Sequence, residues 1–157
     1  MLVLVWIHLL ADVLWIGGML FLSLTLVPVL QQNTFASSRR PFFKAIALRF
    51  RRLAWLCILL LLVTGPLLLS RHVAFPLAPT TWPPVVQAKL TLVFVLLLLT
   101  AIHDLALGPR VGRILSVPEE SRSDRDRWLV GSSRWVPRLS LLLALGILFC
   151  AVMLARR

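Results

Sequence analysis

Four long apolar runs alternate with shorter polar or basic stretches along the chain. The runs cover residues 2–30, 53–70, 85–107 and 136–155. A helix needs roughly 20 apolar residues to cross the hydrocarbon core of a bilayer, a length that these runs approach or exceed. Because lipid cannot hydrogen-bond exposed backbone groups, spans of this kind are helical. The pattern therefore predicts an all-α integral membrane protein built as a bundle of four transmembrane helices.

The composition points the same way. Hydrophobic residues make up 59% of the 157 residues, which exceeds what the core of a soluble domain of this size requires. The four runs take up most of the length, so residues 1–157 are predicted to form a single membrane domain. The first run lacks the basic start and the cleavage pattern of a signal peptide, and we expect it to remain as the first span.

Basic residues concentrate in the first and third polar stretches, residues 31–52 and 108–135, whereas the proline-rich second stretch, residues 71–84, carries Arg71 alone among lysines and arginines. The positive-inside rule then places both termini outside the cytoplasm, in a multi-pass protein of the inner cell membrane. The formal net charge of +11 is thus a topology signal.

The two arginines at the end of the sequence, Arg156 and Arg157, depart from this rule. They do not change the expectation that the chain lies in a lipid bilayer. Because no nucleic-acid-binding motif accompanies the basic residues, we expect the lipid bilayer as a partner and not a nucleic acid.

The first and third apolar runs contain ionisable residues at positions where a charge is costly and usually marks a functional site. In the first run, His8 and Asp12 are one helical turn apart and lie on one helix face. Gly17 and Gly18 follow, and small residues of this kind let a second helix approach closely. We therefore expect this face to point into the bundle.

The third run holds Lys89 near its start and the pair His103 and Asp104 near its end. Lys89 and His103 are separated by about 21 Å along a helix axis, so they mark opposite sides of the membrane. Under the predicted topology His8 and Lys89 have similar depths near the outer side. The prediction is an outer polar site made of His8, Asp12, His72 and Lys89. A second, inner site at His103 and Asp104 stays open.

Histidine in these positions suggests a metal centre. A neutral imidazole ligates copper or haem iron, and a nearby carboxylate can orient the ring. The candidate metal ligands are His8, Asp12 and His72, and the candidate cofactor-binding positions are His8, His72, Lys89 and His103. The alternative is that these groups only hydrogen-bond between helices, with Lys89 reaching the interface or pairing with Asp12. The cysteines and methionines are not clustered, and we expect them to pack in the core.

Two of the runs resemble a known family. The segments "IHLLADVLWIGGMLFLSLTLVP" and "QAKLTLVFVLLLLTAIHDLALGPR" are similar to helices of the copper resistance protein D (CopD) membrane domain. The resemblance rests on His8, Trp15, Gly17, Gly18, Pro28, Lys89 and Pro109. It is more distant to the HemJ-type protoporphyrinogen oxidases, which have a comparable first-helix histidine and third-helix lysine. The absence of tyrosine is a departure from that oxidase pattern.

Three functions follow from the resemblance and the residues. The first is a CopD-like protein that binds copper at the outer site and handles or transports the ion. The second is a haem b protein, for electron transfer or for a HemJ-like oxidation. The third is a non-catalytic assembly subunit. Whether the chain is an enzyme, and whether it pairs with a second copy or with another membrane subunit, stays open.

The predicted topology is tested by labelling single introduced cysteines in intact cells. Positions within residues 31–52 and 108–135 should be protected from an impermeant reagent, and positions within residues 71–84 should react. Labelling of the proline-rich stretch only after the cells are opened would reverse the orientation.

Overall fold

The computed structural model describes residues 2–32, 34, 39–70, 82–133 and 135–155. Within these ranges the regular elements are all helical, which confirms the predicted all-α class. Among the described residues, four helical stretches are long and apolar enough to cross a membrane: Leu2–Leu30, Arg39–Leu69, Pro84–Ser116 and Asp124–Leu154, the last of which spans residue 134, outside the described residues. The predicted four spans are therefore present.

The surfaces of these helices are strongly apolar. Leu9 on the first helix is 53% exposed, Leu59 on the second 59%, and Phe94 on the third 66%. Large apolar side chains in such numbers would be unfavourable in water, but they match the acyl chains of a bilayer. The exposed surface thus agrees with a multi-pass membrane protein.

The chain divides into two compact units, Met1–Thr80 and Thr81–Arg157. Each unit contains two of the four long helices. The prediction that all four spans form a single domain stays a prediction.

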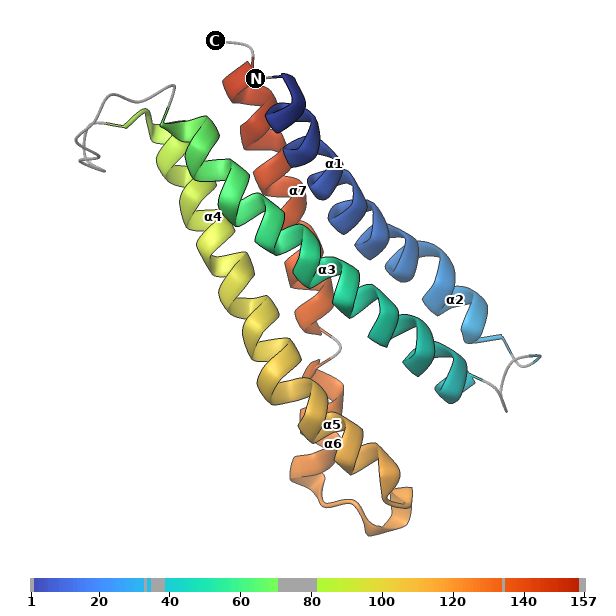
Figure 1. Ribbon diagram of the computed structural model, residues 1–157. Helices are drawn as coiled ribbons and strands as arrows, with labels where there is room; N and C mark the ends of the chain where they lie inside the picture. The colour runs from blue at the N-terminus through green and yellow to red at the C-terminus, as the bar shows by residue number, and fades with distance from the viewer. Residues whose placement is uncertain (1, 33, 35–38, 71–81, 134, 156–157) are drawn as a thin grey trace. The chain divides into compact units, whose positions relative to one another are not determined.

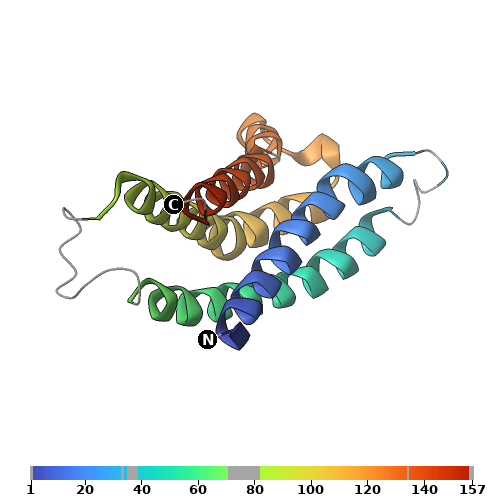
Figure 2. The same ribbon diagram turned by 90° about the horizontal axis from the view of Figure 1, so that it is seen from above.

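The first unit is a helical hairpin. Helix α1, Leu2–Phe21, continues through the π-helical turn η1, Leu22–Leu26, into α2, Val27–Leu30. Helix α3, Arg39–Leu69, runs back along α1 in the opposite direction (Figures 1 and 2). The buried residues of the pair are Ala11, Trp15, Ile16, Ala54, Cys57, Ile58 and Thr64.

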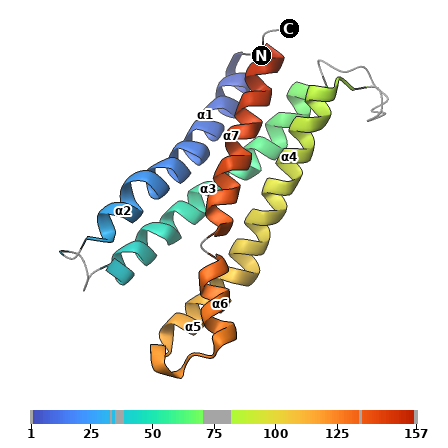
Figure 3. The ribbon, with the colours of Figure 1, turned by 180° about the vertical axis from the view of Figure 1, so that it is seen from behind.

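The second unit is also built around a hairpin, with a smaller one at its end. Helix α4, Pro84–Ala101, packs along α7, Trp135–Ala155 (Figure 3). Between them the chain forms the π-helical turn η4, Ile102–Leu107, then α5, Gly108–Ser116, the short 3-10 helix η5, Glu119–Ser121, and α6, Asp124–Ser133. Helices α5 and α6 contact each other and form the small hairpin (Figure 3).

Both π-helical turns stand just before a proline. The Val27 N–H bonds the Leu22 carbonyl ahead of Pro28, and the Gly108 N–H bonds the His103 carbonyl ahead of Pro109. Proline has no N–H to donate, and its ring clashes with the carbonyl of the preceding turn. A turn widened by one residue relieves that clash, so the first and third spans continue through their prolines as one helix.

Helix boundaries differ from those expected from hydropathy. Helix α3 begins at Arg39 and not at residue 53, so much of the basic first stretch is helical. The third stretch likewise contains α5 and α6. Arginine and lysine are good helix formers, so a span can extend into water as a helix after its apolar run has ended. Of the proline-rich second stretch, residues 71–81 lie outside the described residues.

Of the two adjacent glycines in the first span, one is at a close contact and one is not. A Cβ on Gly18 would overlap the Phe50 ring of α3, whereas a Cβ on Gly17 would meet nothing within 4 Å among the described residues. The structure thus confirms the expected close approach at Gly18.

We predict that Gly18→Leu destabilises the protein by about 1–3 kcal/mol, because the added side chain forces α1 away from α3. Gly17→Leu is the matched control and should be neutral or slightly stabilising, since leucine favours a helix over glycine. Thermal unfolding of both variants in detergent, followed by circular dichroism, measures the difference. Equal losses in the two variants would contradict the packing.

Candidate functional site

His8 lies on the side of α1 that faces α3. Its ring nitrogen Nδ1 is 2.7 Å from the hydroxyl oxygen of Thr64, which is only 4% exposed. The same hydroxyl lies 2.7 Å from the backbone carbonyl of Leu60, one helical turn back along α3. A histidine, a threonine and a carbonyl therefore form a hydrogen-bonded chain inside the first unit.

The directions of these two bonds fix the proton on the imidazole ring. The Leu60 carbonyl can only accept, so the Thr64 hydroxyl must donate its single hydrogen there. The bond between Thr64 and His8 then needs its hydrogen from the ring, which places it on Nδ1. In the neutral imidazole the lone pair is consequently on Nε2, the nitrogen through which this ring could bind a metal.

The α3 backbone passes close to the ring at the next residue. A Cβ on Gly65 would lie 3.7 Å from the His8 Cε1 atom, an ordinary van der Waals contact. A larger side chain at Gly65 would extend toward the imidazole. The sequence Thr-Gly at positions 64 and 65 thus supplies a hydrogen-bond partner and the space for the ring together.

Asp12 follows His8 by one turn of α1 and is half-buried. Its carboxylate is near enough to the buried Cys57 of α3 for an electrostatic interaction with the thiol. The partner that the structure gives for His8 Nδ1 is Thr64. That Asp12 orients the histidine therefore stays a prediction.

The second pair of a histidine and an aspartate, His103 and Asp104, lies in the second unit, Thr81–Arg157. His103 Nδ1 is 3.3 Å from the carboxylate oxygen Oδ1 of its neighbour Asp104, with the side chains 36% and 18% exposed. Both residues belong to η4, the widened turn ahead of Pro109. The distance is long for a charge-assisted bond, so the contact is weak. The structure thus brings together the two residues of the predicted inner site.

The outer site is described only in part. His8 and Asp12 share a face of α1, and Lys89 is a half-buried residue of α4 in the second unit. His72 lies outside the described residues. Among the residues that the structure describes, no group of three or more His, Cys, Asp or Glu side chains is placed to hold a metal ion. The joint outer site of four residues therefore stays a prediction.

Thr64 is the residue that the sequence reasoning missed. It is a lone hydroxyl in the apolar segment "CILLLLVTGPLLL", and a buried hydroxyl in lipid needs a hydrogen-bond partner. Thr64 stands directly before a glycine, a common signal of close helix contact. Antiparallel pairing of the first two spans brings the start of the first span near the end of the second, where Thr64 lies.

Comparisons with known proteins bear on this arrangement. The model of a family described as Copper resistance protein D (CopD) matches residues 44–154. This range includes Thr64, Lys89 and His103 but not His8. A protein of Aquifex aeolicus (strain VF5), described as uncharacterized, is 28% identical over 148 residues, which cover 93% of this chain and 89% of that protein. No solved structure matches the chain.

Nitrogen NMR of protein with labelled histidine tests the proton position. The His8 ring should show a protonated Nδ1, and Thr64→Val should change its signals because the acceptor is lost. Thr64→Ser keeps the hydroxyl and should preserve the parent pattern, while the signals of His103 should stay the same in both variants. A parent His8 ring with its proton on Nε2 alone would contradict the hydrogen-bonded chain.

Proposed function

The chain belongs to the copper resistance protein D family, and on that premise we propose that it handles copper ions through a ligand site inside the membrane. The proposal assigns His8 as the primary ligand, through Nε2. Asp12, His72 and Lys89 are assigned as further groups of the outer site.

The observation that carries this proposal is the hydrogen bond between His8 and Thr64. Metal-binding histidines usually donate their other ring N–H to a protein acceptor, which fixes the ring and its tautomer. Here the acceptor is the buried Thr64 hydroxyl, itself held by the Leu60 carbonyl.

The ligand chemistry is compatible with copper. Imidazole nitrogen binds copper well, whereas thiolate and thioether ligands favour Cu(I) more strongly. Cys57 is buried between α1 and α3, so a soft sulfur atom lies in the same hairpin as His8. We assign it no ligand role, because the described residues form no cluster that includes it.

Haem b binding is the alternative, since haem iron also takes a histidine nitrogen with a fixed ring orientation. Both readings use the same tautomer of His8. A visible absorption spectrum of the purified protein separates them, because haem gives a strong Soret band and bound copper does not. A chain that binds neither would be an assembly subunit.

The sharpest test is a copper and haem titration of purified variants in nanodiscs. His8→Ala should abolish binding of the metal or haem, because it removes the ligand itself. Thr64→Val and Asp12→Asn should each weaken binding by about 10 to 100-fold, the usual loss when a group that orients a ligand is removed. Thr64→Ser retains the hydroxyl and should restore most of the affinity.

His103→Ala is the control, because about 21 Å of helix separates this residue from the depth of Lys89. It should bind like the parent protein. If His8→Ala also binds like the parent in both titrations, His8 is a helix-packing residue and the proposed site is wrong.

A further inference from the structure

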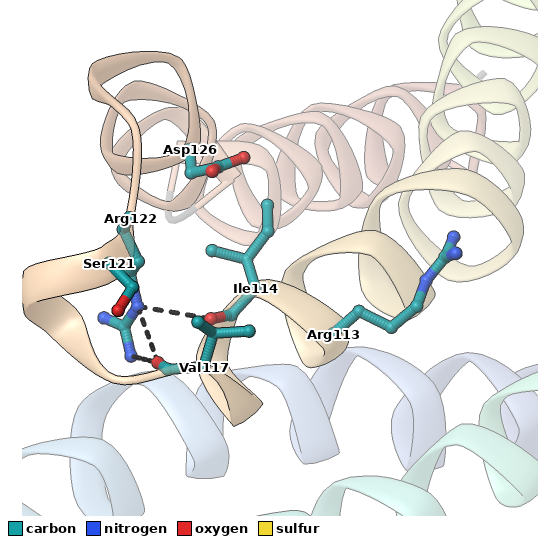
Figure 4. Close-up of a pocket in the computed structure, with 6 residues that line it drawn as sticks. All are labelled: Arg113, Ile114, Val117, Ser121, Arg122 and Asp126. Carbon is teal, nitrogen blue, oxygen red and sulfur yellow. Dashed lines mark hydrogen bonds between the residues drawn. The ribbon is translucent and has the colours of Figure 1, made fainter.

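A groove lies between α5 and α6, where the third span continues beyond its apolar run. Its volume is about 430 Å³, and its lining residues are Arg110, Arg113, Ile114, Arg125, Asp126 and Leu129. A second cavity of about 290 Å³ adjoins it at the turn of the hairpin and shares Arg113, Ile114 and Asp126 (Figure 4). Three arginines and two apolar residues therefore line a shallow, open groove.

The turn of this hairpin is held by Arg122. Its Nε donates to the carbonyls of Ile114 and Val117, both at 3.2 Å, and its Nη2 donates to Val117 at 2.8 Å (Figure 4). The last carbonyls of a helix have no partner within the helix, and Arg122 supplies donors for those of α5. Its charge thus serves the turn of the hairpin.

The acidic residue that lines the groove, Asp126, is engaged in hydrogen bonds with Ser123. The Ser123 hydroxyl and N–H donate to Oδ2 of Asp126 at 2.9 and 3.3 Å, and the Asp126 N–H donates back to the hydroxyl at 3.2 Å. This is a capping box at the start of α6. It fixes the Asp126 carboxylate against the start of α6.

Among the described residues, the side chains of three arginines at the groove have no partner of this kind. Within the described ranges, the side chains of Arg110, Arg113 and Arg125 make no hydrogen bond, ion pair or ring contact. Arg110 and Arg113 are one turn apart on α5, and the drawn Arg113 side chain extends away from Arg122 (Figure 4). Three guanidiniums against one engaged carboxylate leave a surplus of positive charge.

The position of the groove identifies the kind of anion. Helix α5 is the continuation of the apolar helix Pro84–Ser116, and α6 leads into the apolar helix α7. Trp128 of α6 is 71% exposed, as expected of an indole at the headgroup level of a bilayer. Ile114 and Leu129 give the groove an apolar floor. A phosphate attached to acyl chains matches both the charges and the apolar surroundings.

We propose that the α5–α6 groove binds the headgroup phosphate of an anionic phospholipid. Arginine forks hydrogen-bond phosphate oxygens in pairs, and basic pockets beside membrane spans attract anionic lipids. The proposal uses none of the residues of the proposed copper site and does not rest on it. The exposed residues Arg39, Arg40 and Lys44 at the start of α3 carry the same charge without a cavity among those described around them, and they provide the control.

Native mass spectrometry of the full chain, reconstituted with phosphatidylglycerol and phosphatidylcholine, tests this proposal. The parent should retain phosphatidylglycerol in preference to phosphatidylcholine. The triple variant Arg110→Gln, Arg113→Gln, Arg125→Gln should bind it about 100-fold more weakly, since each arginine near an anionic surface contributes several-fold. The triple variant Arg39→Gln, Arg40→Gln, Lys44→Gln removes equal charge and should retain it.

The single variant Arg113→Gln, which removes one residue from both cavities, should show a smaller loss in the same direction and covers the case in which the triple variant does not fold. Equal losses in the two triple variants would show a diffuse attraction and overturn the proposal. Unchanged retention in the groove variants would overturn it as well. Displacement of the lipid by an equal concentration of inorganic phosphate would show a site for a free anion.

Discussion

A polar group inside a bilayer must find its hydrogen bonds within the protein, and this constraint explains the main features of the chain. It makes the four apolar runs helical. It requires the Thr64 hydroxyl to bond the Leu60 carbonyl, and it leaves His8 to donate to that hydroxyl. The same constraint widens the turns ahead of Pro28 and Pro109, because a helix with a missing donor must rearrange its neighbouring bonds. The position of the proton on the His8 ring thus follows from the apolar surroundings of the helix.

Much of the fold could be predicted from the sequence. Hydropathy located the four spans because a bilayer demands length and apolarity, and both can be counted. Hydropathy could not give the start of α3 at Arg39, because arginine and lysine interrupt an apolar run without interrupting a helix. Nor could it give the π-helical turns, which depend on how a helix accommodates a proline that it contains.

The candidate site was predictable only in part. His8 and Asp12 could be placed on one face from the helical period alone, since both belong to one segment. The bond from His8 to Thr64 joins residues far apart in the chain, so it depends on the register of α1 against α3. Small residues set that register: Gly18 faces the Phe50 ring and Gly65 faces the imidazole. A pattern of apolar residues contains little information on such a match, because leucine-rich helices can pair in several registers.

The family match and the geometry of the first unit bear on different parts of the proposed copper site. The matched range begins at residue 44 and contains Thr64 and Gly65, which form the surface that receives the histidine. His8 itself lies before that range, and its assignment rests on the hydrogen bond that α1 makes to α3. If copper binding depends on the hairpin as a unit, a change in the α3 surface should affect binding only through its effect on the His8 ring. Thr64→Val and His8→Ala combined should then bind as little copper as His8→Ala alone, because the threonine acts only through the ring. Residual binding in His8→Ala that is lost in the double variant would show that Thr64 contributes to the site independently of His8.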